Sequence, residues 1–341
     1  MATIKDVAAR AGVSATTVSF IMNGEGEAKH ISRETIRRVQ ESMEELGYRK
    51  RGAGAGPFYP QKRQAIAFFW PMDYRTNILG YRLGHFQNVL QEKYPDIEIV
   101  VQTYRYNRLG DFLGPLRKGR YAGAIVGGPS EADVRALEQL SLSLPVVLLN
   151  RESLLYSTVG VNSTKLGLRA AALLQRAGHR QCAVVRAADR YTGSGGRTDA
   201  FCYACRQLGI ELREEWTYRG SPTIRGGAEA TRLFCRDPSR PRMLYYEADC
   251  MAQGGLYSLK EAGLAVPGDV EILAVSTQTP ETMQYLSPSI STVALPPEVD
   301  RQAIELLAEL VEGGRSGPVR IEIEPVVQLR ESFFIKNENP S

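Results

Sequence analysis

The feature that most constrains this chain is its N-terminal stretch, in which two short helical patterns lie on either side of a tight Ala-Gly-Val turn. Thr3 has the side chain of a helix N-cap, and Asp6 follows three residues later as a capping-box partner. Gly12 is suited to end this first helix, because glycine takes the left-handed conformation that a C-terminal cap requires. Ser14 predicts the cap of a second helix, which ends at Asn23. Such a pair is a helix-turn-helix, whose second helix can enter a DNA major groove.

A third helical pattern completes a small helical unit. Ser32 predicts its N-cap, and Gly47 is expected to end it. The apolar faces of the three helices are predicted at Ile4, Val7, Ala8 and Ala11, at Val18, Ile21 and Met22, and at Ile36, Val39, Met43 and Leu46. Spacing alone leaves two interpretations open, a DNA-binding unit or an ordinary helical hairpin at the start of a larger fold.

The residues themselves resemble a known family. TIKDVAARAGVS, TVS and MN between Thr3 and Asn23, followed by ISRETIRRVQESMEELGYR from Ile31, are similar to the N-terminal headpiece of the Lac/galactose-repressor family. The resemblance implies a small all-α headpiece over residues 1–48 that binds a specific sequence of double-stranded DNA. Because two headpieces read two half-sites, it also implies a homodimer on a near-palindromic operator.

The second helix carries most of the residues that we expect to contact DNA. Base contacts are predicted for Ala15, Thr16 and Phe20. Contacts with the DNA backbone are predicted for Ser14, Thr17, Ser19, Asn23, Arg33, Arg49 and Arg51. Phe20 stands where many relatives carry arginine or histidine, and its ring has no hydrogen bond to donate. We therefore expect it to make an apolar contact, for instance with a thymine methyl group.

Residues 49–63, RKRGAGAGPFYPQKR, predict a linker between the headpiece and the rest of the chain. Each interior glycine costs a helix roughly 1 kcal/mol relative to alanine, and proline costs more, so a stable helix is not expected. In the family this segment typically folds on the operator as a hinge helix with a leucine wedge, and that sequence is missing here. One interpretation is a flexible tether whose basic residues touch phosphates. The other is that Phe58 or Tyr59 acts as an apolar wedge in the minor groove.

From residue 64 short apolar runs alternate with helical patterns, which predicts parallel sheets covered by helices on both faces. Strands are expected at 65–70, 97–103, 122–127 and 146–149, and again at 182–186, 243–246 and 271–275. Helices are expected near 80–92, 109–118 and 131–141, and again near 164–177, 196–208, 224–235 and 250–262. Two such series predict two doubly wound lobes, and a ligand is expected beyond the C-terminal strand ends, in a cleft between them.

This region also resembles the periplasmic-binding-protein-like core of the same family. The similar segments are PVVLLNR (145–151), GHRQCAVV from Gly178, RTDAFCYACRQLG with Arg197 and Phe201, DCMAQGGLYSLKEAGLAVPGDVEILAV from Asp249, STVALP (291–296) and VVQLRESF (326–333). The resemblance implies an effector-binding and dimerisation core over 64–335, followed by a tail at 336–341. Its three crossings imply an N-terminal lobe of about 64–161 and 293–320, and a C-terminal lobe of about 162–292 and 321–335.

The expected effector site departs from the family pattern. Arg197 matches the family arginine that holds polar groups of the effector, whereas Ser276 replaces the family aspartate. Losing a carboxylate acceptor removes a bidentate grip on sugar hydroxyls, so the small-molecule effector is not expected to be a typical sugar. The residues predicted to bind it are Arg197, Ser276, Asp249, Asp73, Tyr74, Asn150, Arg190 and Tyr191.

Enzymatic and transport functions fit the sequence less well. It has only three histidines and no GxSxG, HExxH or GxxxxGK[ST] motif, so no catalytic residues, metal or cofactor are predicted. The glycines at 193–196 are interpreted as a flexible loop, and Cys202 and Cys205 as small buried side chains. A transport-type solute-binding protein would suit the core alone, but the headpiece and the lack of an apolar export signal argue against it. We expect a cytoplasmic regulator, a repressor whose operator affinity depends on the effector, with no membrane partner.

Overall fold

The computed structural model describes residues 3–22, 29–46, 64–73, 78–117, 120–140, 142–189, 191–277 and 280–335. The chain divides into two compact units, Met1–Lys62 and Arg63–Ser341. The predicted linker 49–63, with Phe58 and Tyr59, lies outside the described residues, as does the tail 336–341.

The first unit contains three helices, α1 (Ile4–Ala11), α2 (Ala15–Met22) and α3 (Arg33–Glu45). Thr3 caps α1 in a full capping box with Asp6, and Gly12 ends the helix with a φ of 65°. The side-chain hydrogen bond from Thr3 lowers the pKa of Asp6. The buried apolar side chains in the described part of this unit form one cluster of Val7, Ala8, Ala11, Val18 and Val39. The helix-turn-helix predicted from the spacing is therefore present.

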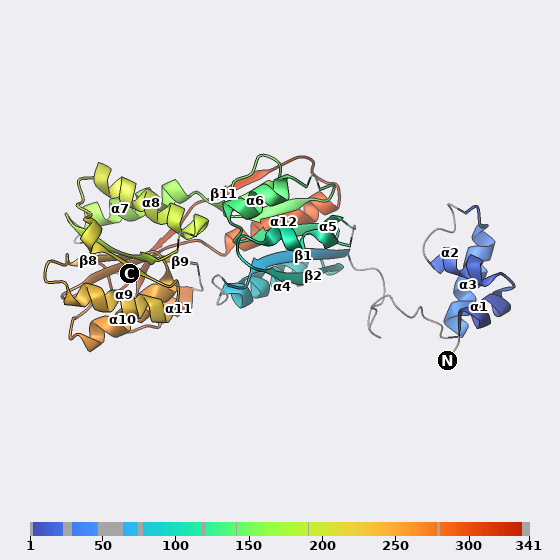
Figure 1. The fold of residues 1–341 in the computed structure, drawn as a ribbon, viewed down its shortest axis with the longest axis horizontal. Helices are drawn as coiled ribbons and strands as arrows, with labels where there is room; N and C mark the ends of the chain where they lie inside the picture. The colour runs from blue at the N-terminus through green and yellow to red at the C-terminus, as the bar shows by residue number, and fades with distance from the viewer. Residues whose placement is uncertain are drawn as a thin grey trace. The chain divides into compact units, whose positions relative to one another are not determined.

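The second unit contains two sheets of similar order (Figure 1). The first has the order β11-β5-β4-β3-β1-β2 and the second β12-β10-β9-β8-β6-β7. The strands of the first sheet are β1 (Gln64–Pro71), β2 (Ile97–Tyr104), β3 (Gly123–Gly127), β4 (Val146–Leu149), β5 (Ser157–Val161) and β11 (Arg320–Ile323). Those of the second are β6 (Cys182–Ala187), β7 (Thr217–Gly220), β8 (Met243–Tyr246), β9 (Glu271–Ser276), β10 (Ser291–Ala294) and β12 (Val326–Gln328). All pairings are parallel except β10 with β12. The predicted class, two doubly wound lobes, is confirmed.

Helices cover both faces of each sheet (Figure 1). In the first lobe they are α4 (Leu79–Lys93), the 3₁₀ turn η2 (Leu109–Phe112), α5 (Gly114–Arg117), α6 (Glu131–Glu138) and α12 (Glu298–Val311). In the second they are α7 (Ser163–Arg176), α8 (Thr192–Gln207), η3 (Glu214–Trp216), α9 (Ile224–Arg236), α10 (Asp249–Glu261) and α11 (Pro280–Gln284). The single helix expected near 109–118 is instead η2 followed by α5. Proline at 115 has no N–H to continue a hydrogen-bonded helix from η2.

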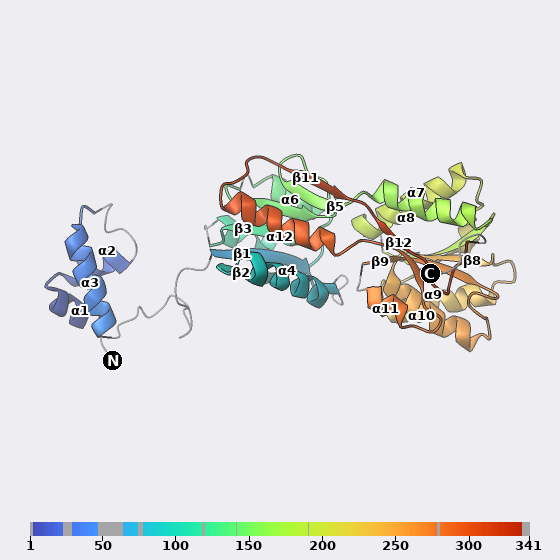
Figure 2. The same ribbon diagram turned by 180° about the vertical axis from the view of Figure 1, so that it is seen from behind.

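The lobe boundaries differ from those predicted at two of the three crossings. β11 pairs with β5, so residues 321–323 belong to the first lobe. β10 pairs with β9, so residues 293 and 294 belong to the second. The chain therefore crosses after Val161, after Ala294 and after Ile323, and Figure 2 shows the last crossing, which leads from β11 into β12.

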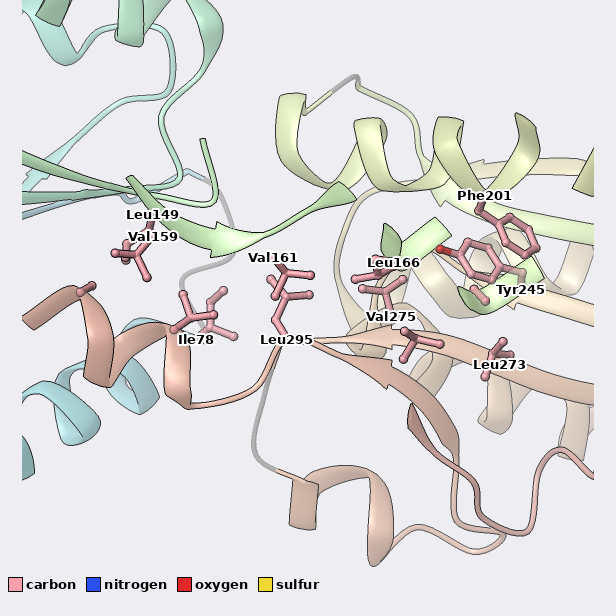
Figure 3. Close-up of a cluster of buried hydrophobic side chains, with 14 of the residues drawn as sticks. Ile78, Leu149, Val159, Val161, Leu166, Phe201, Tyr245, Leu273, Val275 and Leu295 are labelled. Carbon is pink, nitrogen blue, oxygen red and sulfur yellow. The ribbon is translucent and has the colours of Figure 1, made fainter. Parts of the chain in front are cut away.

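One cluster of buried apolar side chains continues from the first lobe into the second (Figure 3). Leu149 and Val159 belong to its first-lobe part, and Phe201 and Tyr245 to its second-lobe part, where their rings stack with centroids 3.8 Å apart. Val161 and Leu295, which lie at two of the crossings, connect the parts. The lobes are consequently joined by packed apolar contacts as well as by the crossing chain.

Candidate functional site

The outward side of α2 is the candidate DNA-reading surface. Thr16 is exposed, and Phe20 is half-buried with the Lys29 ammonium 5.2 Å from its ring centroid. Ala15 is half-buried and packs against the headpiece core, so it offers less surface to a base than was expected. Lys29 was not anticipated, and its cation–π contact with Phe20 adds a positive charge beside the predicted apolar reading residue.

The hydroxyl groups at the start of α2 are engaged with the helix itself. Ser14 Oγ accepts from the backbone N–H of Thr17 at 3.0 Å and lies 2.8 Å from Thr17 Oγ1. Ser19 is half-buried, and Arg33 is exposed at the start of α3. Asn23, Arg49 and Arg51 lie outside the described residues. Ser14 and Thr17 therefore stabilise the N-terminus of α2, where backbone N–H groups favour a phosphate.

A second candidate site is a cavity of about 40 Å³ between the lobes of the core. Its walls come from the C-terminal ends of strands in both sheets, and from α4 and α8, where open α/β lobes bind ligands. The described residues that line it are Trp70, Ile78, Arg82, Gly128, Leu149, Asn150, Arg151, Gly193, Arg197, Thr277 and Leu295. A larger hollow of about 620 Å³ shares Asn150, Arg151 and Gly193 with it.

Two of the predicted effector residues line this cavity. Arg197 is a buried residue of α8 and faces it from the second lobe. Asn150 lies directly after β4 with a φ of 53°, and its Oδ1 accepts from the Val161 N–H at 3.0 Å. The Asn150 side chain thus ties the end of β4 to the first crossing between the lobes.

Asp73 and Tyr191, also predicted to bind the effector, are not among the residues that line the cavity. Asp73 accepts a hydrogen bond from the backbone N–H of Tyr106 at 2.9 Å. The ring of Tyr106 meets that of Tyr191 edge-on, with centroids 5.1 Å apart. Because Tyr106 belongs to the first lobe and Tyr191 to the second, this pair connects the lobes. Tyr74 and Arg190 lie outside the described residues.

Asp249 and Ser276, both predicted to contact the effector, are hydrogen-bonded to each other. Asp249 is 0% exposed, and its Oδ2 accepts from Ser276 Oγ at 3.0 Å and from the Thr277 N–H at 2.7 Å. Its Oδ1 accepts from the Cys250 N–H at 2.8 Å. Neither Asp249 nor Ser276 lines the cavity. Their interaction connects the start of α10 to the end of β9.

Several lining residues escaped the sequence analysis. Arg82 forms a buried ion pair with Asp300 of α12, and its guanidinium carbon lies 5.6 Å from the Trp70 ring centroid. Burial raises the pKa of Asp300, although Arg82 partly counters this effect. Arg151 donates from Nε to the Pro129 carbonyl at 2.5 Å and from Nη1 to the Asn150 carbonyl at 2.7 Å. An arginine following a buried strand, as Arg151 does, was a usable signal. Nothing in the sequence identified the pairing between α4 and α12.

The glycines at 193–196 do not form the predicted loop. They lie in the first turns of α8, and Gly193 is buried. A Cβ at Gly193 would overlap the guanidinium of Arg151, so a larger residue would require that guanidinium to shift. Gly193 therefore leaves room for the Arg151 side chain beside the cavity.

Cys202 and Cys205 were predicted to be small buried side chains. Burial raises the pKa of Cys205 and of Cys202, which keeps their thiols protonated and poorly reactive.

Among the described residues there is no group of three or more His, Cys, Asp or Glu side chains placed to hold a metal ion. Within the same residues, no helix combines the length and the apolar character needed to cross a membrane.

Comparisons with known proteins agree with this two-part organisation. The family described as "Bacterial regulatory proteins, lacI family" matches residues 3–50, and that described as "Periplasmic binding protein-like domain" matches residues 157–333. The "HTH-type transcriptional repressor PurR" of Pectobacterium carotovorum subsp. carotovorum (strain PC1) is 27% identical, with 97% of each chain covered. The protein of the same name from Edwardsiella ictaluri (strain 93-146) is 28% identical over the same shares.

Solved structures give the same result. A LacI family transcription regulator from Clostridium acetobutylicum has a TM-score of 0.75 and 25% identity, covering 78% of this chain and 99% of its own. The "transcriptional regulator CelR-cellobiose complex" has a TM-score of 0.66 and 24% identity, covering 97% of this chain and 100% of its own. The second of these, below 25% identity, bears on the fold alone.

A helix-turn-helix unit joined to a two-lobed periplasmic-binding-protein-like core defines a ligand-responsive DNA-binding regulator. The chain belongs to the LacI family of bacterial regulatory proteins. It is a transcriptional regulator of the repressor type and not an enzyme, because its relatives are repressors of this family, and both predictions are confirmed.

Proposed function

We propose that this repressor acts in the cytoplasm as a homodimer that binds a near-palindromic operator and responds to a small molecule held between its core lobes. The observation that carries the proposal is the cavity between the lobes, which is lined by residues of both sheets and includes the predicted Arg197. A ligand that contacts both lobes binds the closed arrangement better than an open one. It can therefore shift the balance between the two.

On the DNA side, Thr16 and Phe20 are proposed to contact bases, with Ala15 contributing mainly to packing. Phosphate contacts are assigned to Ser14, Thr17, Ser19, Asn23, Arg33, Arg49 and Arg51. The start of α2 supports this assignment, because Ser14 is exposed and its Oγ accepts from the Thr17 N–H in the first turn of the helix. A homodimer follows from the two half-sites of a near-palindrome, since a two-fold operator requires a two-fold protein.

On the effector side, Arg197 and Asn150 are proposed to contact the small molecule. Asp73, Tyr74, Arg190 and Tyr191 are proposed to form the rim of the site. Coupling to DNA is reciprocal: an effector that weakens operator binding must itself be bound more weakly by the operator complex, by the same factor. Because the glycine-rich linker lacks the family's hinge sequence, we propose that this factor stays below about a hundredfold.

The first test is to retain genomic fragments on the purified full-length protein, sequence them and measure binding of the recovered site by gel shift. A shared near-palindrome is the expected result. Retention with no shared motif would contradict a sequence-specific operator, and a solute-binding protein would retain no fragment. Sedimentation of the complex should give two chains per site.

The second test measures operator affinity with and without a saturating effector. Arg197→Met is expected to abolish the response to the effector while operator affinity without effector stays unchanged. Arg219→Met is the matched control, because Arg219 lies on edge strand β7, away from the cavity, and pairs with Glu214 at 3.4 Å. A full response in Arg197→Met would exclude the assigned role, and a change of a hundredfold or more in the wild type would contradict weak coupling.

A further inference from the structure

The cavity between the lobes has an unusual supply of hydrogen-bond donors. Among its described lining residues are three arginines, Arg82, Arg151 and Arg197, and the indole of Trp70. Arginine and tryptophan side chains donate hydrogen bonds and accept none. The same lining contains no aspartate or glutamate. A molecule bound here therefore meets mostly donors.

Two of these donors are buried and have no acceptor among the described residues. Trp70 is 3% exposed, and its Nε1 makes no hydrogen bond there. Arg82 is 6% exposed, and its Nε also makes no hydrogen bond to the described residues. Its Nη1 is paired with Asp300. A buried donor without an acceptor has lost its hydrogen bonds to water and destabilises the folded protein. Both atoms belong to residues that line one cavity, so a single group with several acceptor atoms could satisfy them.

The charges around the cavity point to the sign of that group. The charge of Arg82 is offset by Asp300, which is 3% exposed and lies behind it in α12. Arg151 is held by two backbone carbonyls, those of Pro129 and Asn150. Carbonyl oxygens orient a guanidinium without neutralising its charge. The described lining thus holds more positive than negative charge, which favours an anion.

The size of the cavity limits what the closed lobes can enclose. A cavity of about 40 Å³ has room for a few water-sized groups, since roughly 10–15 Å³ is enough to hold one water molecule. An oxyanion head of a few atoms is of this scale, whereas a whole sugar ring is larger. The adjoining hollow, which shares Asn150, Arg151 and Gly193, is large enough for the rest of a small ligand.

We propose that the effector of this repressor is a small organic anion whose carboxylate or phosphate group binds between Arg151, the Trp70 indole and Arg82. The proposal rests on the proposed function, in which the cavity is the effector site. Arg151 supplies the charge, Trp70 Nε1 and Arg82 Nε supply directed donors, and Gly193 leaves room for Arg151. The hydroxyl groups of a neutral sugar can accept hydrogen bonds from these donors. They carry no negative charge, however, and cannot offset the charge of Arg151.

The test uses sets of equal carbon number in which a neutral compound is compared with a carboxylate and a phosphate: glucose, glucuronate and glucose 6-phosphate; galactose, galacturonate and galactose 6-phosphate; glycerol, glycerate and glycerol 3-phosphate. Full-length protein is titrated with each compound at constant ionic strength, and Tm and binding heat are recorded. We expect at least one anion to raise Tm by about 5–10 °C at a hundredfold excess over its Kd. The carboxylate and phosphate members identify which oxyanion is preferred. Neutral members that bind equally well, or no stabilising anion in any set, would overturn the proposal.

Variants then locate the bound anion. Arg151→Met removes a charge, and Trp70→Phe removes one donor while keeping an aromatic ring; each is expected to weaken anion binding about tenfold or more. Arg219→Met is the control and should bind the anion like the wild type. Tm without ligand and operator affinity without ligand show whether each variant is folded. An anion that stabilises Arg151→Met and the wild type equally is bound elsewhere, which would refute the assignment.

The outcomes separate this proposal from the function on which it depends. A neutral ligand that changes operator affinity through Arg197 would retain the repressor mechanism and exclude the anion. An anion that binds through Arg151 without changing operator affinity would retain the anion site and exclude its role as effector. Binding heat measured on the same full-length protein distinguishes the two cases.

Discussion

The buried Arg82–Asp300 ion pair gives a prediction whose size follows from its burial. The two side chains are 7% and 4% exposed, and they connect α4 to α12. Arg82→Met keeps an unbranched side chain of similar length but leaves the Asp300 carboxylate buried without its partner. Breaking a buried pair in this way costs about 3–5 kcal/mol in the free energy of unfolding. For a core of this size the loss corresponds to a Tm lowered by about 6–15 °C.

The sign of the pH dependence follows from the Asp300 carboxyl. Burial raises its pKa in the folded protein, with Arg82 and His85 partly countering, so protonation favours the folded state. The destabilisation is fully present above the folded pKa and disappears as the pH falls toward the ordinary value of 3.8. Because Arg82→Met removes the largest opposing influence, its deficit relative to the wild type should be smaller at an acidic pH than at neutral pH.

Urea unfolding of the variant and the wild type at both pH values measures this effect. Arg82→Met/Asp300→Leu is the control, because replacing both members with apolar residues should recover most of the lost stability. A cost below about 1 kcal/mol for Arg82→Met, or a double variant as unstable as the single one, would refute the reasoning.

Three further predictions concern other parts of the chain. Gly254→Ala should cost about 2–3 kcal/mol by urea unfolding, because its Cβ would overlap the Ile224 carbonyl where α9 meets α10, whereas Gly80→Ala, with open space around it, should cost nothing. Val39→Ala should destabilise the headpiece by about 2 kcal/mol and weaken operator binding while the Tm of the core stays unchanged, since Val39 is fully buried in the headpiece cluster. Replacing the thymine read by Phe20 with uracil should weaken operator binding in a gel shift, and unchanged affinity would show that the ring is only packed.

The sequence predicted the repeating architecture well because long apolar runs and caps are local signals. The capping pair of Thr3 and Asp6 and the apolar run that ends at Leu149 can be recognised from neighbouring residues alone. The short strands β5, β7 and β10 were missed, since four or five residues with serine, threonine and glycine among them lack a distinctive pattern. Two crossings were misplaced because their positions depend on which strands β10 and β11 pair with, and that pairing joins distant parts of the chain.

The candidate site was predicted less completely for the same reason. Arg197 was reached through its motif, but Arg82 is paired with a residue 218 positions away, and no local pattern announces that partner. Asp249 was predicted to contact the effector, whereas the structure shows its carboxylate hydrogen-bonded within the second lobe. The Thr277 N–H, which occupies its carboxylate, lies 28 positions along the chain. Side-chain partners across a fold of this length are decided by packing.

The interleaved crossings have a consequence for the order of events during synthesis. The first lobe needs α12 to cover its sheet and β11 to complete its edge, and the second needs β12. Both lobes therefore stay incomplete on the ribosome until the last strands, at 320–328, have left the exit tunnel. Until α12 emerges, the apolar face of β3, β4 and β5 that it covers is exposed and open to chaperones and to aggregation. The headpiece draws its buried cluster from residues 7–39 alone, so it can fold long before the effector core exists.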